Sequence, residues 1–262
     1  MEAIYTEGKG ARIYGELRGN GPRRVVLLHG WGCSVKLMES LAEHLSEECR
    51  VLSLDFPGFG KSDRPPEPWG VPDYAACLKE ALEKLDFLPC AAVGHSFGCR
   101  VAAWAESEWP EMFSRMVFTG AAGLKAPATE ESRKRAEAFQ KKKRLARTIG
   151  RIPFLQEAGK KLEDKYRKQY GSADYNALDA EMRQTFVKVV NLDLRDRYGR
   201  IPVSTLLIWG DADTETPLWM GQEMEKLIPD AGLVILEGGS HFAYLEQAPR
   251  FNLITRHFLT EG

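Results

Sequence analysis

The chain has 262 residues, of which 44% are hydrophobic and 28% are charged, and its formal net charge is −1. A chain of this length can bury a substantial core, and α/β folds of this size commonly form one domain with an insertion. The nearly balanced charge gives no reason to expect a nucleic-acid or membrane partner, and no apolar run reaches the roughly 18 residues of a membrane span.

The five cysteines are odd in number and lack the paired spacing of a disulfide scaffold or a zinc site. We therefore expect free thiols and no bound metal. Residues 1–8 have no basic segment followed by an apolar stretch, which is the pattern of a signal peptide. These observations predict a soluble, cytoplasmic protein, and they leave the oligomeric state open.

Alternating apolar residues predict an antiparallel leading strand over 11–17, paired with residues 2–6. Short apolar runs then recur along the chain, separated by segments with helical periodicity. The runs cover 25–29, 51–55, 90–94 and 116–119, and the helical patterns cover 35–46, 74–85 and 98–108. This alternation predicts a mostly parallel sheet with helices on both faces. The loops after the parallel strands then lie along one edge, where α/β sheets carry their sites.

The alternation stops near Ala122 and resumes near Ile201. The residues between are rich in helix formers over 130–148, 157–170 and 178–193. Residues 125–168 contain 15 Lys or Arg and 6 Asp or Glu, so this part of the chain is strongly basic. The basic run 141–144 is most simply a solvated helix face, and the alternative is a surface that attracts an anionic substrate.

The segment Gly94-His95-Ser96-Phe97-Gly98 follows a predicted strand and opens a predicted helix. A serine on so sharp a turn adopts a strained backbone conformation with positive φ, and bulky residues two positions away would clash with the strand and the helix. Glycine at both flanking positions removes these clashes. This context is the one that a nucleophile elbow requires, and it makes Ser96 the candidate nucleophile.

Two later loops supply candidate partners for this serine. The loop after the apolar run 204–208 contains Asp211 and Asp213, and the loop after the run 233–236 contains His241. The other four histidines lie on helical segments or inside motifs, which makes His241 the candidate base. Either aspartate could supply the acid, and an aspartate can also cap a turn through its own side chain.

With Ser96, an aspartate and His241 in this order, the chain resembles the α/β-hydrolase superfamily, and the cap-bearing serine hydrolases in particular. The resemblance spans about residues 11–121 and 200–260. It includes 25–32, which resembles the family's oxyanion loop, and 55–62, which resembles the loop after its next strand. The resemblance implies an α/β-hydrolase core formed by residues 1–121 and 200–262, with a helical cap inserted at 122–199.

The resemblance also implies Asp213, rather than Asp211, as the acid that orients His241, and the backbone N–H of Trp31 as one donor of the oxyanion hole. The N–H of Phe97, at the start of a helix, is expected to be the second donor. Gly30, Phe139 and Phe154 are expected to line the substrate pocket. We read the loop 55–62 as structural, because it lacks the spacing of a phosphate-binding loop.

These residues predict a cofactor-independent serine hydrolase that cleaves a carboxylic ester of a small to medium substrate through an acyl-enzyme. Amide or iminopeptide cleavage, C–C bond hydrolysis, lactone opening, perhydrolysis and acyl transfer use the same triad and stay open. So does a non-catalytic ligand receptor on the same fold. Haloalkane dehalogenation is disfavoured because the elbow residue is serine. The sequence does not identify the acyl or alcohol part of the substrate.

Overall fold

The computed structural model describes residues 1–125, 130–150, 157, 161–162, 175–176 and 178–261. The chain divides into two compact units, Met1–Leu124 with Val187–Gly262 and Lys125–Phe186. The second unit falls inside the range 122–199 that the sequence assigns to an inserted cap. That this insertion acts as a cap stays a prediction.

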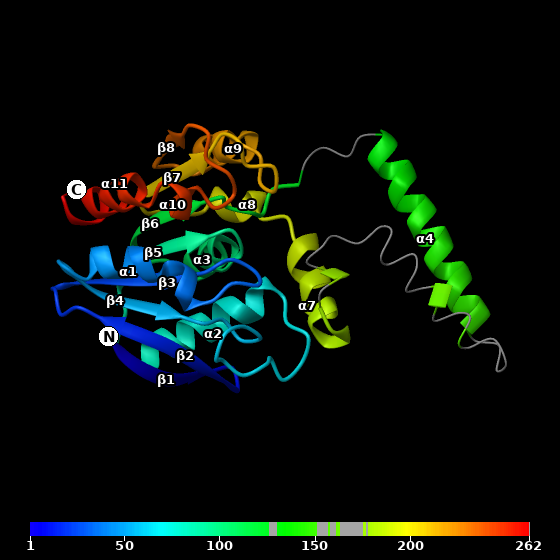
Figure 1. Cartoon of the computed structure of the whole chain (residues 1–262), viewed down its shortest axis with the longest axis horizontal. Helices are drawn as coiled ribbons and strands as arrows, with labels where there is room; N and C mark the ends of the chain where they lie inside the picture. Colours follow the sequence, from blue (N-terminus) through cyan, green and yellow to red (C-terminus); the bar gives the residue numbers. More distant parts are fainter. Residues whose placement is uncertain (126–129, 151–156, 158–160, 163–174, 177, 262) are drawn as a thin grey trace. The chain divides into compact units, whose positions relative to one another are not determined.

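The first unit is built on one sheet of eight strands in the order β1-β2-β4-β3-β5-β6-β7-β8 (Figure 1). The strands are β1 (Glu2–Gly8), β2 (Ala11–Arg18), β3 (Arg23–Leu28), β4 (Cys49–Leu54), β5 (Cys90–His95), β6 (Phe113–Thr119), β7 (Thr205–Gly210) and β8 (Ala231–Leu236). Strand β2 is antiparallel to both β1 and β4, and the other pairs are parallel. The predicted mostly parallel sheet is therefore confirmed.

Position in the sheet explains the residue pattern of each strand. All six residues of the central strand β5 are buried, and the first five form a continuous run of small and apolar residues. The edge strand β1 is largely exposed, and its exposed and half-buried residues alternate from Ala3 to Glu7. It pairs with β2 through a tight hairpin in which Lys9 and Gly10 both have positive φ.

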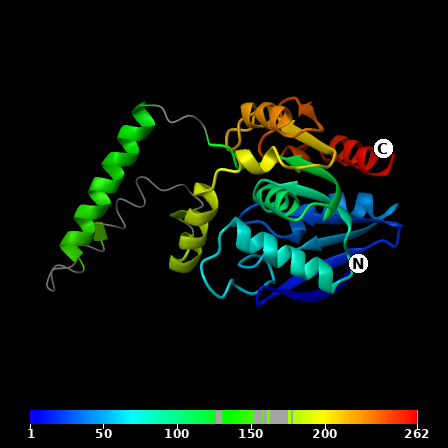
Figure 2. The same cartoon turned by 180° about the vertical axis from the view of Figure 1, so that it is seen from behind.

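Helices cover both faces of this sheet. One face carries α1 (Glu39–Leu45), preceded by the short helix η1 (Val35–Met38), together with α10 (Ala243–Glu246) and α11 (Ala248–Thr260). Val25 and Leu27 of β3 pack there in one buried cluster with Leu41, Leu45 and Phe251. The other face carries α2 (Val71–Lys84) and α3 (Phe97–Glu108), which lie in front of the strands in Figure 2.

Helix α2 begins three residues earlier than the periodicity indicates. Its first turn contains Pro72, whose lack of an N–H costs nothing there, because N–H groups in the first turn have no acceptor within the helix. The turn also contains Asp73, whose Oδ2 accepts the N–H of Gly70 at 2.8 Å. Two further helices, α8 (Arg195–Tyr198) and α9 (Trp219–Leu227), flank β7 in the sequence.

The second unit contains α4 (Glu130–Gly150) and the first part of α7 (Ala180–Asn191), as the segments rich in helix formers predict. Asp179 caps α7, because its Oδ1 accepts the N–H groups of Glu181 and Met182. The helix predicted over 157–170 lies largely outside the described residues. No helix in the described part of the chain is long and apolar enough to cross a membrane.

The parallel strands β3, β5, β6, β7 and β8 run in one direction, so the loops that follow them meet at one edge of the sheet. These loops carry every candidate residue that the sequence places in the core: 29–32 after β3, 96–97 after β5, 211–217 after β7 and 237–242 after β8.

Candidate active site

Ser96 stands between β5 and α3 with φ +50° and ψ −103°, the strained positive-φ backbone of a sharp turn. Its N–H donates to the carbonyl of Thr119 at 3.0 Å, which ties the turn to the end of β6. A Cβ atom at position 98 would lie 2.2 Å from the carbonyl oxygen of Leu28, and one at position 94 would lie 2.9 Å from the amide nitrogen of Cys99. Glycine at these two positions is what allows the turn to form.

His241 and Asp213 are in contact at the ends of two neighbouring strands. The Nδ1 atom of His241 lies 2.8 Å from Oδ2 of Asp213, and both side chains are buried. Asp211 lies elsewhere: it is exposed, and its Oδ1 accepts the N–H of Gly238 at 2.7 Å. The structure therefore brings Asp213 to the histidine and leaves Asp211 to stabilise the turn.

The Asp213 carboxylate is held by several donors. Its Oδ1 accepts the N–H groups of Glu215 and Thr216, both at 2.9 Å, and its Oδ2 accepts the hydroxyl of Thr216 at 2.7 Å. Burial alone would raise the pKa of Asp213, but the hydrogen bonds from His241 and Thr216 outweigh burial and hold this pKa below its usual value. An ionised Asp213 keeps a proton on Nδ1 of His241, so that Nε2 is the nitrogen that can accept a proton.

Two residues at this pair were not singled out from the sequence. Thr216 is one, and the spacing Asp-x-x-Thr is a local signal for it, because such side chains bond within a turn. Gly120, which follows β6 with φ +52°, is the other. A Cβ atom there would lie 3.0 Å from Nδ1 of His241 and 3.4 Å from Oδ2 of Asp213. His241 and Asp213 therefore pack against the backbone of Gly120, with no side chain between them.

His95 supports the backbone of the loop that carries His241. Its Nε2 lies 3.0 Å from the carbonyl oxygen of His241, and the two imidazole rings are 4.7 Å apart. Burial, together with the nearby His241, lowers the pKa of His95 to about 3. His95 is thus a neutral ring, and donation from Nε2 to the His241 carbonyl helps to fix that loop.

The predicted oxyanion loop packs directly on the elbow. A Cβ atom at Gly30 would lie 3.5 Å from Cβ of Ser96 and 2.6 Å from Nδ1 of His95. His29 is fully buried; its Nε2 accepts the N–H of Phe56 at 3.0 Å, and its Nδ1 donates to the carbonyl of Gly30 at 2.7 Å. Burial lowers the pKa of His29, so it remains neutral and holds the peptide just before Trp31.

Phe97 is the first residue of α3, where a backbone N–H has no acceptor inside the helix. Its ring is buried and packs edge-on against the rings of Trp31 and Tyr74, with centroids 5.3 and 5.0 Å away. The side chain of Phe97 is thus part of the packing beneath the site. The N–H groups of Trp31 and Phe97 remain the predicted oxyanion donors.

The loop 55–62 has a structural role. The buried Asp55 accepts the N–H groups of Val35 and Lys61 at 2.7 and 2.8 Å. Of the other predicted pocket residues, Phe139 lies on α4 in the second unit, where it is partly buried, and Phe154 lies outside the described residues. Their part in a substrate pocket stays a prediction.

Glu215 is a further charged group at the site that sequence reasoning did not single out. Its Oε2 lies 3.7 Å from Nε2 of His241, and 62% of its side chain is exposed. The sequence offers no specific signal for this contact, because an acidic residue in a turn is ordinary.

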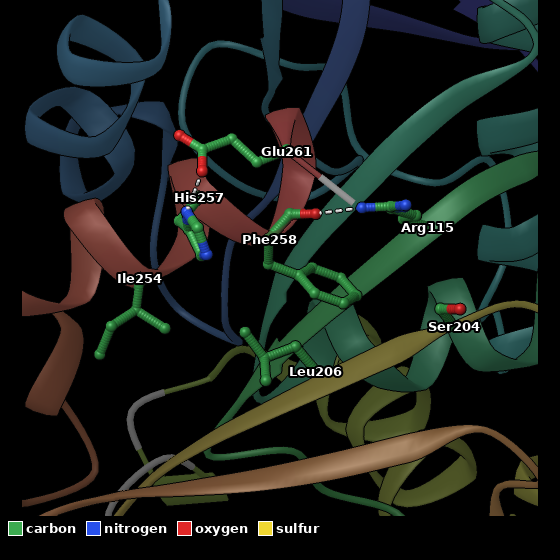
Figure 3. Close-up of a pocket in the computed structure, with 7 residues that line it drawn as sticks. All are labelled: Arg115, Ser204, Leu206, Ile254, His257, Phe258 and Glu261. Carbon is green, nitrogen blue, oxygen red and sulfur yellow. Dashed lines mark hydrogen bonds and ion pairs between the residues drawn. The ribbon is translucent and has the colours of Figure 1, made fainter.

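A cavity of about 360 Å³ lies beside the start of strands β6 and β7 (Figure 3). It is lined by Arg115, Ser204, Leu206, Ile254, His257, Phe258 and Glu261. Arg115 donates to the carbonyl of Phe258, and His257 pairs with Glu261 at 2.7 Å. Since Arg115 and Ser204 stand where β6 and β7 begin, this cavity is separate from the site where the strands end.

Known proteins resemble this chain over nearly their whole length. A hydrolase of 2-hydroxy-6-oxononadienedioate and 2-hydroxy-6-oxononatrienedioate from Escherichia coli is 26% identical, over 96% of this chain and 92% of its own. An esterase from Exiguobacterium antarcticum superposes with a TM-score of 0.75 at 22% identity, over 98% of this chain and 99% of its own. A meta-cleavage product hydrolase from Pseudomonas fluorescens gives a TM-score of 0.73 at 23% identity, over 100% and 98%.

The family model of the alpha/beta hydrolase family matches residues 25–252, from the strand before the oxyanion loop to the last helix. This match covers most of the chain and confirms the resemblance that the sequence indicates. The chain belongs to the alpha/beta hydrolase family.

Proposed function

We propose that this protein is a serine hydrolase that cleaves a carboxylic ester of a small to medium substrate. The observation that carries the proposal is a strained elbow serine at the same sheet edge as a buried histidine that is hydrogen-bonded to a buried aspartate. A protein that only bound a ligand on this fold would not need the positive-φ serine, the protonated Nδ1 of His241 and an ionised Asp213 together.

In the first half of the reaction, Nε2 of His241 accepts the proton of the Ser96 hydroxyl while Oγ attacks the ester carbonyl carbon. Asp213 stabilises the imidazolium that forms. The carbonyl oxygen becomes negative and is stabilised by the N–H groups of Trp31 and Phe97. The bond from carbon to the alcohol oxygen then breaks, His241 returns its proton to the leaving alcohol, and the acyl group stays on Ser96.

In the second half, water takes the place of the alcohol. His241 removes a proton from this water, the resulting hydroxide attacks the acyl carbon, and the bond to Oγ breaks. Ser96 regains its proton from His241, and the carboxylic acid leaves. Apart from the substrate and water, neither half needs a group outside the chain.

Hydrolysis of a C–C bond is the second candidate. It is favoured by the relative from Escherichia coli, which hydrolyses 2-hydroxy-6-oxononadienedioate and is similar over nearly the whole chain. Such a substrate carries two carboxylates, and the Glu215 carboxylate at Nε2 of His241 would repel them. This repulsion is why we place ester hydrolysis first.

A substrate panel tests the proposal. The purified protein is assayed on p-nitrophenyl esters of several acyl lengths, on the matching anilides, and on a 2-hydroxy-6-oxo-dienoate. We expect turnover of short or medium esters, and we expect Ser96→Ala to abolish it. The control Ser204→Ala should retain it, because Ser204 lies just before the start of β7, at the other end of the strands. Turnover of the dienoate with inert esters would instead assign C–C hydrolysis.

A further inference from the structure

Nε2 of His241 is the nitrogen that would accept the proton of Ser96 beside a bound substrate. The carboxylate of Glu215 lies next to this nitrogen. Oε2 of Glu215 is 3.7 Å from Nε2 of His241. We infer that Glu215 is a specificity-determining residue that selects substrates carrying a cationic amine near the bond to be cleaved. This inference rests on the proposed function, because it assumes that a substrate is held at Ser96.

The backbone of Glu215 is held in place by the triad itself. Its N–H donates to Oδ1 of Asp213 at 2.9 Å, and the next residue, Thr216, donates to the same oxygen. The start of the Glu215 side chain is therefore fixed relative to the catalytic pair. Its far end is 62% exposed, so the carboxylate is open to a ligand as well as to the imidazole.

The distances suit an amine close to the carbonyl carbon that Ser96 would attack. A proton transfer from Ser96 to Nε2 needs about 3 Å between the two atoms, and nucleophilic attack begins at about 3–3.5 Å from the carbonyl carbon. The Glu215 carboxylate then lies within roughly 10 Å of that carbon. An ammonium group a few bonds away from the carbonyl can reach it.

Glu215 is also the exposed one of the two carboxylates beside His241. Asp213 is ionised but buried, and its oxygens are occupied by His241, Thr216 and backbone donors. Among the described residues, His241 is the basic group found within 4 Å of the Glu215 carboxylate. A substrate ammonium would therefore be attracted here, and a substrate carboxylate in the same place would be repelled.

Three matched boronic acids test the inference without relying on ester chemistry. Boron accepts the serine oxygen and takes the place of the carbonyl carbon. The set is 3-(aminomethyl)phenylboronic acid, 3-ethylphenylboronic acid and 3-carboxyphenylboronic acid, which differ mainly in charge. Their inhibition constants are measured at low ionic strength by competition with a fluorophosphonate probe that labels Ser96.

We expect the ammonium compound to bind about three- to tenfold more tightly than the neutral one, and the carboxylate compound to bind more weakly by a similar factor. The ratio of the neutral compound's inhibition constant to that of the ammonium compound should fall close to one in Glu215→Gln and at about 0.5 M salt. Glu237→Gln is the control, because it removes an exposed carboxylate from the loop after β8, and it should keep the wild-type order.

Equal binding of the three compounds by the wild type, or an unchanged ammonium preference in Glu215→Gln, would overturn the role of Glu215 and leave the proposed function intact. Failure of the probe to label Ser96, or of every boronic acid to protect it, would overturn the proposed function and this inference with it.

Discussion

At the scale of single residues, the site depends on how the Asp213 carboxylate is satisfied. Four donors converge on its two oxygens, and one of them is the imidazole of His241, the proposed base. Asp211, two residues earlier, has the same chemistry and a different environment, since it faces an exposed turn. Position rather than residue type therefore favours Asp213 over Asp211 as the proposed acid.

Asp213→Asn is expected to lower kcat by about 10⁴, because an amide cannot hold the proton on Nδ1 of His241 and stabilise the imidazolium. Asp211→Asn is the matched control and should change kcat by less than about threefold. Steady-state kinetics on the best ester of the panel measures both. A larger loss in Asp211→Asn than in Asp213→Asn would show that the acid is assigned wrongly.

Thr216→Val removes one donor to Asp213 while nearly keeping the side-chain shape. The pKa of Asp213 is lowered in the folded state, so the carboxylate stabilises the fold above its ordinary pKa of about 4, and this contribution is lost as the pH falls through the folded value. The variant should raise that folded pKa and be less stable than the wild type by about 1–2 kcal/mol at pH 7.

The same reasoning predicts how the difference in stability between Thr216→Val and the wild type depends on pH. It should shrink as the pH falls below about 4, because the protonated carboxyl no longer gains from the hydroxyl. Urea unfolding between pH 3 and pH 7 measures it. A difference in stability that stays constant over this range would mean that Thr216 acts through packing and not through the Asp213 carboxylate.

At the scale of elements, the turn from β5 into α3 is the feature on which the site is built. The helix can approach β3 closely because position 98 has no side chain: a Cβ atom there would lie 2.2 Å from a backbone oxygen of that strand. Backbone cannot move aside as a flexible side chain can, so this contact is intolerant of any larger residue.

Gly98→Ala should therefore destabilise the protein by about 3 kcal/mol, since it forces α3 away from β3. Gly232→Ala is the control within a strand, because nothing lies within 4 Å of a Cβ atom at that position. It should be neutral or stabilise the fold by up to about 1 kcal/mol, by restricting the unfolded chain. Urea unfolding compares the two, and equal stabilities would contradict the close approach at the elbow.

At the scale of the whole molecule, much of the first unit can be predicted from the sequence, because parallel strands buried on both faces leave long apolar runs. The loop after each run is then placed at one edge by topology, so the sequence groups Ser96 and His241 with the loop that holds Asp211 and Asp213. The choice of Asp213 between the two aspartates rests on the resemblance to α/β-hydrolases. Gly120 and Glu215 could not be assigned in this way, since their roles come from contacts across loops.

The sequence predicts less about the inserted segment, residues 122–199, than about the first unit. Its residues favour helices, and α4 and α7 are found where the pattern indicates them. Helical propensity does not say which face of α4 is covered, however, and the sequence places Phe139 and Phe154 in a pocket on their apolar character alone. Their contribution depends on tertiary contacts that local sequence does not encode.

The most direct test of the whole account is covalent labelling with a fluorophosphonate, read by mass spectrometry of the digested protein. We predict one adduct per chain, on Ser96, that is absent in Ser96→Ala and forms much more slowly in Asp213→Asn, because activation of the hydroxyl requires the oriented imidazole. Labelling on another residue, or undiminished labelling and ester turnover in Ser96→Ala, would contradict the assignment of the triad.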